Sequence, residues 1–124
     1  LCGICATPPS AEIHKSALGA ENTISWEYFE ESTDAVKRLK AEGYEAISVE
    51  QTENSIMLND IKLDRDRRYA LIFGNEVKGV SQEVVDMSDT VLEIPQHGTK
   101  HSINVSVSIG VVLWEFSKHI GRNQ

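Results

Sequence analysis

Short apolar runs alternate along this chain with longer segments whose apolar residues are spaced as on one face of a helix. Four apolar runs predict strands at residues 1–6, 44–49, 69–73 and 91–94. Helices are predicted from Ser10 to about residue 17, from a cap at Ser32 or Thr33 to Gly43, and from Ser81 through residue 85. Residues 23–28 read as a short strand or connector, and residues 53–68 as polar and irregular. Strands that alternate with helices predict an α/β fold with a mainly parallel sheet and flanking helices.

The last apolar segment, from about Ser102 to His119, is predicted to be a long helix. Its valines and isoleucines favour a strand by propensity, but a length of about 18 residues is typical of a helix and far exceeds a usual strand. Its apolar residues form two stripes, one with Val107, Val111 and Trp114 and another with Val105, Ile109, Val112 and Phe116. We expect one stripe to cover the sheet and another to meet a second copy, as in a homodimer, because 124 residues leave little else to bury it.

Composition narrows the class of protein. A chain of 124 residues with 40% hydrophobic and 25% charged residues is sufficient for one globular domain. The net charge of −7 argues against broad electrostatic capture of nucleic acid, although a local basic patch remains compatible with it. The longest apolar stretch is interrupted by Ser106, Ser108 and Gly110 and is too short for a membrane span of about 20 residues. No membrane partner is therefore expected.

The two cysteines, Cys2 and Cys5, have the spacing of a redox pair or of half a zinc site. Positions three apart on a strand point to opposite faces, and the sequence holds no second cysteine pair. Buried strand residues in a reducing, cytoplasmic setting are the preferred interpretation.

Two glycine-containing polar loops follow apolar strands and precede probable helices, at residues 72–79 and 94–107. Side by side, such loops would form a pocket of backbone amides and carbonyls, which suits a nucleotide-like cofactor. In a parallel sheet ligands sit beyond the carboxyl ends of strands. Glu50, Gln51 and Thr52 follow another predicted strand and are expected at the same edge.

These loops also resemble motifs of a known family. Residues 73–80 read FGNEVKGV, and residues 94–107 contain Ile94-Pro95, Gly98 and the run SINVSV from 102. They resemble the second and third motifs of the SpoU (TrmH-like) branch of the SPOUT RNA methyltransferases. Residues 15–20 and Thr7-Pro8 are similar to further family segments, so the resemblance extends from residue 1 to about residue 116.

The resemblance implies an S-adenosyl-L-methionine-dependent methyltransferase acting on a ribose 2′-hydroxyl of tRNA or rRNA. It also implies a C-terminal trefoil knot, a homodimer and chemistry without a metal. RNA contacts would come from local positive residues such as Lys78, His97, Lys100 and His101.

Site residues follow from the same resemblance. Gly74, Ile94 and Ile103 would contact the cofactor mainly through backbone atoms, with Gln51, Thr52, Asn75 and Gly79 as further cofactor-binding residues. Glu76, Ser102 and Asn104 would be the polar catalytic side chains, with Glu76 orienting a basic group. Four of these residues also have a simpler interpretation. Gly74 and Gly79 would suit a turn, Ser102 would suit a helix cap, and Asn104 would suit the first turn of a helix.

One departure from the family pattern matters for activity. The first family motif, with an asparagine and an arginine, has no match and is expected upstream of Leu1, so residues 1–124 read as an N-terminally truncated methyltransferase domain. Arg65, Arg67 and Arg68 precede a different strand and are not assigned the missing role. A catalytically silent RNA-binding or dimerisation module of the same fold is the main alternative, and a domain binding another nucleotide is a third.

Overall fold

The computed structural model describes residues 2, 25, 27–75, 78–95 and 104–120, and the chain divides into two compact units, Leu1–Lys37 and Arg38–Gln124. In the first unit, Cys2 and Phe29 form an isolated parallel bridge. The strand predicted at 1–6 and the helix predicted from Ser10 lie outside the described residues, apart from Cys2. Helix α2 (Ser32–Ala41) begins in the first unit and ends in the second.

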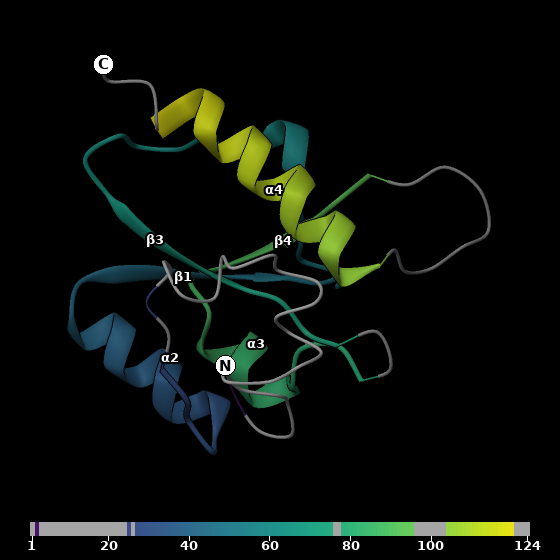
Figure 1. Ribbon diagram of the computed structural model, residues 1–124. Coiled ribbons are helices and arrows are strands. Elements are labelled where there is room, and N and C mark those ends of the chain that lie inside the picture. The colour runs from purple at the N-terminus through teal and green to yellow at the C-terminus, as the bar shows by residue number, and fades with distance from the viewer. Residues whose placement is uncertain (1, 3–24, 26, 76–77, 96–103, 121–124) are drawn as a thin grey trace. The chain divides into compact units, whose positions relative to one another are not determined.

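The second unit is built on a four-stranded sheet in the order β2-β4-β1-β3 (Figure 1). Its strands are β1 (Tyr44–Val49), β2 (Ile56–Met57), β3 (Arg68–Ile72) and β4 (Thr90–Glu93). Every pairing in this sheet is parallel, which confirms the predicted α/β fold class. Strand β2 lies where an irregular segment was predicted, because two residues are too few to show an alternating pattern.

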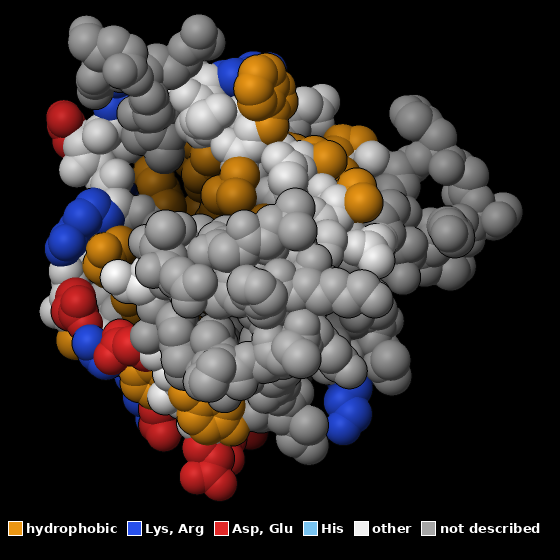
Figure 2. All heavy atoms as spheres, viewed as in Figure 1, with side chains coloured by type: hydrophobic (Ala, Val, Ile, Leu, Met, Phe, Trp, Pro, Cys, Tyr) orange, Lys and Arg blue, Asp and Glu red, His pale blue; other side chains and the backbone are white. Residues whose placement is uncertain are grey.

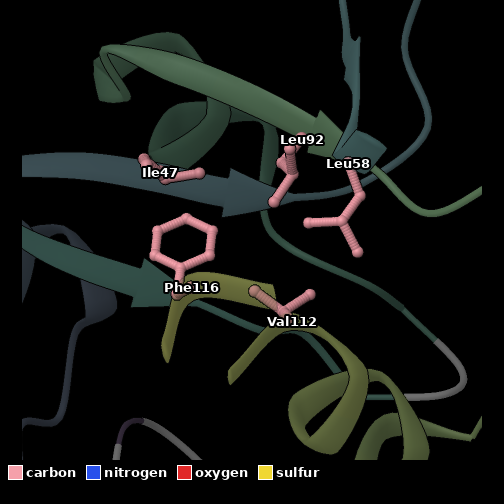
Figure 3. Close-up of a cluster of buried hydrophobic side chains, with 5 residues drawn as sticks. All are labelled: Ile47, Leu58, Leu92, Val112 and Phe116. Atoms are coloured by element: carbon pink, nitrogen blue, oxygen red, sulfur yellow. The ribbon is translucent and has the colours of Figure 1, made fainter. Parts of the chain in front are cut away.

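One face of the sheet is covered by helix α4 (Val105–Ile120) (Figure 1). Val112 and Phe116 of α4 are buried with Ile47 of β1, Leu92 of β4 and Leu58 of the short 3₁₀ helix η2 (Leu58–Asp60), as Figure 3 shows. The rings of Phe116 and Tyr69 meet edge to face with centroids 5.9 Å apart. The prediction that one apolar stripe of this helix covers the sheet is therefore confirmed.

The opposite face of β1 meets helix α3 (Gln82–Met87). Ser48 alternates with Ile47 along the strand, and its buried hydroxyl lies 2.6 Å from that of Ser88, directly after α3. The Ser88 hydroxyl in turn donates to the carbonyl of Val84, and the Val84 side chain is buried. The helix begins as predicted, because the Ser81 side chain accepts a hydrogen bond from the Val84 amide.

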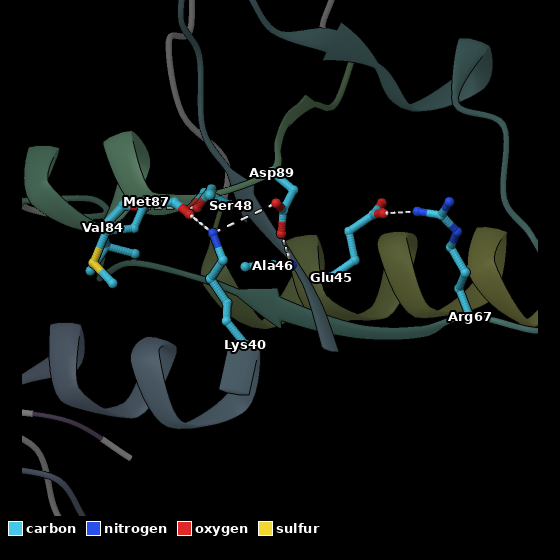
Figure 4. Close-up of polar contacts among 9 residues, drawn as sticks. Lys40, Glu45, Ala46, Ser48, Arg67, Val84, Met87 and Asp89 are labelled. Atoms are coloured by element: carbon cyan, nitrogen blue, oxygen red, sulfur yellow. Dashed lines mark hydrogen bonds and ion pairs between the residues drawn. The ribbon is translucent and has the colours of Figure 1, made fainter. Parts of the chain in front are cut away.

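Polar contacts tie the start of β4 to the start of β1. Asp89 and Ala46 exchange two hydrogen bonds of 2.8 Å, one through the Asp89 carboxylate and one through its amide. The Lys40 ammonium donates to the Met87 carbonyl at 2.7 Å and lies 3.6 Å from the Asp89 carboxylate (Figure 4). These contacts fix the amino ends of the two strands, opposite the edge where their loops emerge.

Element boundaries differ from the predicted ones by few residues. Strand β1 matches the prediction, and β3 and β4 are each displaced by one residue toward the N-terminus. Helix α2 already includes Ser32 and Thr33, so neither is the flanking cap that was predicted. It ends at Ala41, and Gly43, the predicted stop residue, follows two residues later with φ of 94°, a conformation that favours glycine. Helix α4 begins at Val105 rather than at Ser102, with Asn104 before it.

Candidate functional site

The carboxyl ends of β1, β3 and β4 meet at one edge of the sheet because all three strands are parallel. The strand order places β1 between β3 and β4. The sequence suggested that the two glycine-containing loops lie side by side. Strand β1 instead separates them, so they start two strand spacings apart, about 10 Å. The segment that follows β1 begins between them. Periodicity identifies strands but does not give their lateral order, so this arrangement could not be read from the sequence.

The turn after β3 is closed by backbone contacts between its two ends. A Cβ atom on Gly74 would overlap the carbonyl carbon of Gly79 and the amide nitrogen of Val80. Asn75 and Gly79 form an antiparallel bridge, in which the Gly79 amide donates to the Asn75 carbonyl at 3.0 Å. The Asn75 side chain accepts from the Lys78 amide at 2.6 Å, and Gly79 has φ of 67°. Both glycines are thus required by the turn itself, which also leaves backbone exposed to approach by a ligand.

Glu50, the first residue after β1, joins this turn to the middle of the sheet. Its Oε2 accepts a hydrogen bond from the Val80 amide at 2.9 Å, and its Oε1 accepts one from the Gln51 amide at 3.3 Å. Its own amide donates to the Leu92 carbonyl of β4 at 2.9 Å. The sequence placed Glu50 at this edge but gave no signal that distinguished it from Gln51 and Thr52.

The segment after β1 folds back beside the end of β4. The Thr52 carbonyl accepts from the Ser55 amide at 3.3 Å, and the Ser55 hydroxyl lies 2.8 Å from that carbonyl and 2.6 Å from a carboxylate oxygen of Glu93. Gln51 is exposed, Thr52 is half-buried, and Ile94 is half-buried against the core. The structure thus brings these three predicted cofactor-binding residues to the same edge.

Asn104 caps α4. Its Oδ1 accepts from the Ser106 amide at 2.8 Å, while its carbonyl accepts from the Ser108 amide at 2.9 Å. Asn104 is therefore the residue before the helix, not a first-turn residue, and it has the capping role that the sequence gave to Ser102. The side-chain oxygen of this exposed asparagine is well placed to accept from the first amides of the helix, so the loop ends and the helix begins at this residue.

Helix α4 runs antiparallel to the strands, so its N-terminus points toward the carboxyl edge of the sheet (Figure 1). Phe116, in the last half of the helix, contacts Tyr69 near the amino end of β3. The twelve residues from there back to Asn104 span about 18 Å at 1.5 Å per residue, longer than β3 itself. Asn104 is thereby directed to the edge that carries Gly74 and Thr52. Glu76, Ser102 and Ile103 lie outside the described residues.

Two of the arginines near the sheet are engaged at the opposite edge. Arg67 contacts the Glu45 carboxylate at 2.6 Å, and this hydrogen bond, followed by the charge of Glu45, raises the pKa of Arg67 above its ordinary value. Arg68 lies over the Tyr44 ring, 4.5 Å from its centroid, and donates to the Glu42 carbonyl. Both contacts are at the amino ends of β1 and β3, away from the loops at the carboxyl edge.

Metal ligands do not gather in the described part of the chain. No group of three or more histidine, cysteine, aspartate or glutamate side chains there could hold a metal ion. Cys2 is a free thiol, whereas Cys5, His97 and His101 fall outside the described residues. No helix among the described residues is long and apolar enough to cross a membrane.

Comparison with known proteins now identifies the family. The sequence profile of the SpoU rRNA Methylase family matches residues 2–114, nearly the whole chain. The chain belongs to the SpoU rRNA methylase family. This membership confirms the resemblance drawn from the two loop motifs.

Curated relatives of this SpoU family chain share its sequence at moderate identity. It is 30% identical over 97 residues to a tRNA (guanosine(18)-2'-O)-methyltransferase of Borreliella burgdorferi, covering 78% of the chain and 44% of the relative. It is 31% identical over 98 residues to the protein of the same name from Aquifex aeolicus, covering 77% of the chain and 46% of the relative. The chain therefore spans less than half the length of these two relatives.

Solved structures of the family have the same fold. The A. aeolicus TrmH/SpoU tRNA modifying enzyme superposes with a TM-score of 0.77 at 25% identity, over 86% of this chain and 53% of that one. An AdoMet-bound rRNA methyltransferase from Sinorhizobium meliloti superposes with a TM-score of 0.85 at 24% identity, over 96% of this chain and 44% of that one. The second likeness, at its lower identity, supports the fold alone.

Proposed function

We propose that residues 1–124 form a methyltransferase domain that transfers a methyl group from S-adenosyl-L-methionine to a ribose 2′-hydroxyl of tRNA or rRNA. The observation that carries the proposal is the glycine turn after β3, closed by Gly74 and Gly79 at the carboxyl edge of a parallel sheet. It occurs in a family whose relatives include proteins named tRNA (guanosine(18)-2'-O)-methyltransferase.

The described residues fit an adenosyl cofactor. The edge presents backbone from Gly74 and Gly79 on one side and from half-buried Ile94 on the other, with β1 between them. Backbone groups and apolar side chains recognise a nucleoside by shape and hydrogen bonding, without charge. In the proposal Gly74, Ile94 and Ile103 bind through backbone atoms, beside Gln51 and Thr52, while Asn75 and Gly79 shape the turn. When bound, S-adenosyl-L-methionine supplies an activated methyl group on a sulfonium.

The remaining task of the protein is to position the hydroxyl and assist the loss of its proton. We assign the positioning to Ser102 and Asn104, which can hydrogen-bond to the cofactor end or to the ribose. Asn104 supports this role because its Oδ1 is engaged by the Ser106 amide, which fixes the side chain at the start of α4. Glu76 is assigned to orient a basic group rather than to act as the base.

A homodimer is part of the proposal. Val107, Val111 and Trp114 form one stripe of α4, and their exposed fractions are 55%, 39% and 69%. Figure 2 shows exposed hydrophobic side chains along this helix. Apolar stripes of this kind are typical of surfaces that pair with another protein, and a second copy is the simplest partner. A C-terminal trefoil knot and a cytoplasmic location beside RNA substrates complete the proposal.

A labelling experiment tests the reaction. The chain is incubated with S-adenosyl-L-methionine carrying a tritiated methyl group and with total RNA, and the RNA is then hydrolysed in alkali. Alkali cleaves RNA through attack by the 2′-hydroxyl, so a ribose 2′-O-methyl group leaves its label in an uncleaved dinucleotide. We expect the label in dinucleotides, whereas label in mononucleotides would place the methyl group on a base and contradict the proposal.

The second candidate is a catalytically silent RNA-binding or dimerisation module of the same fold. It is favoured by one observation, the engagement of Arg67 and Arg68 at the amino edge of the sheet, away from the loops. The same labelling experiment, together with a measurement of ligand binding, separates the two. Binding of S-adenosylhomocysteine and RNA without transfer of label would support the module, and transfer of label to ribose would exclude it.

A further inference from the structure

We propose that Glu50 is a positioning residue of the cofactor site, whose carboxylate holds the turn after β3 against the end of β1. The inference rests on the proposed function, since it concerns the same edge of the sheet. In this role the Glu50 side chain does not contact the cofactor or the RNA. It acts through the backbone of the residues that it bonds.

Glu50 contacts all three strand ends at the site. Its amide donates to the Leu92 carbonyl of β4 at 2.9 Å, and its Oε2 accepts from the Val80 amide, beyond the β3 turn, at 2.9 Å. Its Oε1 accepts from the Gln51 amide at 3.3 Å, which orients the segment that follows β1. One residue thus sets the spacing between the 74–80 turn and Gln51, both predicted to contact the cofactor.

The turn has the shape that this carboxylate requires. A Cβ atom on Gly79 would overlap Oε2 of Glu50, so the absence of a side chain at residue 79 leaves the space that the carboxylate occupies. Gly79 also adopts φ of 67°, which other residues rarely do. The glycine therefore serves both the backbone conformation and the contact with Glu50.

The two bonds that Glu50 accepts come from backbone N–H groups, and each goes to a different oxygen of the side chain. A carboxylate supplies both, whereas a glutamine supplies one oxygen and one NH₂ group. Glu50→Gln keeps the size of the side chain but sets a donor against one of the two amides. Because hydrogen bonds to a charged acceptor are the stronger kind, we expect the turn to loosen while the hydrophobic core, which does not include Glu50, stays intact.

The test compares wild type, Glu50→Gln and Glu50→Ala with a matched control, Glu45→Gln. Glu45 lies on β1, the strand that ends directly before Glu50, and bonds Arg67 at the opposite edge. Calorimetry measures the affinity for S-adenosylhomocysteine, NMR measures hydrogen exchange of the Val80 amide, and thermal melting monitors folding. We expect Glu50→Gln to weaken binding about tenfold and Glu50→Ala at least as much. We also expect faster exchange at Val80 in both Glu50 variants and wild-type binding in Glu45→Gln. In the methylation assay the KM for S-adenosyl-L-methionine should rise more than kcat falls.

The outcomes distinguish this inference from the proposed function. If wild type binds S-adenosylhomocysteine and Glu50→Gln binds it equally well, with unchanged exchange at Val80, the role of Glu50 is overturned and the proposed function stands. Equal weakening by Glu45→Gln also overturns it, because the effect would then be general. If wild type binds no S-adenosylhomocysteine, the proposed function fails and the inference fails with it. Should Glu50→Ala not fold, the nearly isosteric Glu50→Gln decides.

Discussion

Gly74 and Gly79 approach each other so closely across the turn after β3 that a single Cβ on Gly74 would overlap the carbonyl carbon of Gly79. The atoms in the way belong to the backbone and cannot rotate aside as a flexible side chain would. The bridge between Asn75 and Gly79 holds the turn in this conformation. The turn is therefore sensitive to the smallest change at residue 74.

Gly74→Ala should destabilise the chain by roughly 1–3 kcal/mol, because the added methyl group forces the backbone of the turn to shift. Binding of S-adenosylhomocysteine should weaken at the same time. Gly110→Ala is the matched control, since a Cβ there meets nothing within 4 Å and should stabilise α4 by about 0.5–1 kcal/mol. Urea unfolding at low protein concentration, with calorimetry, measures both effects. If Gly74→Ala is as stable as Gly110→Ala, the close approach of Gly74 to Gly79 is contradicted.

Asn104 permits its capping role to be separated from its proposed role in the site. Asn104→Ala removes the acceptor for the Ser106 amide and should lower stability by about 1 kcal/mol. It should also abolish methyl transfer. Asn104→Asp keeps an oxygen at the same place, so stability should stay near wild type, while loss of the side-chain NH₂ group should still abolish transfer. Thermal melting and the tritium assay give the two readouts. Full transfer by Asn104→Asp would leave Asn104 with the cap alone.

Trp114 tests the homodimer. Trp114→Glu places a charge in the exposed stripe of α4 and should convert a dimer to a monomer without loss of helix, because the side chain lies outside the core. Leu113→Glu is the control, since Leu113 is also exposed but lies about 100° around the helix from Trp114. Sedimentation velocity measures the masses. A wild-type monomer at high concentration, or a dimer that survives Trp114→Glu, would exclude this stripe as the interface.

Glu115 predicts a dependence of stability on pH. Hydrogen bonds with His119, at 3.1 Å, and then with Lys118, at 3.3 Å, lower the pKa of Glu115 below its ordinary value. A lowered folded-state pKa stabilises the fold above the unfolded pKa, and this contribution is lost as the pH falls through the folded pKa. Wild type should therefore melt slightly above Glu115→Gln at pH 7, and the difference should shrink once the pH falls below the ordinary glutamate pKa of about 4.3. A difference that does not shrink below that pH would contradict the assignment.

The sequence predicted the elements better than their arrangement. Strand β1 could be located because an apolar run follows Gly43, and α4 because its length outweighed the strand propensity of its valines. Strand β2 was missed because Ile56 and Met57 are recognisable only through their pairing with Leu92 and Glu93 of β4. Local patterns do not encode that kind of long-range contact.

The candidate site shows the same limit. The motif residues Gly74, Asn75 and Ile94 were found in the sequence, and the structure places them at one edge. The position of β1 between the two loops depends on lateral strand order, so the contact of Glu50 with Val80, thirty residues away, had no local signal. Asn104 was assigned to the site but not to the cap, because Ser102 is an equally good capping residue by type.

The central claim is that the carboxyl edge of β1, β3 and β4 binds S-adenosyl-L-methionine. Titration of the ¹⁵N-labelled chain with S-adenosylhomocysteine, followed by amide NMR shifts, tests it most directly. We predict saturable shifts at Thr52, Gly79, Val80 and Ile94, with Tyr44 and Arg68 at the amino edge unchanged. No shifts at millimolar ligand, or shifts centred on Tyr44 and Arg68, would contradict the claim.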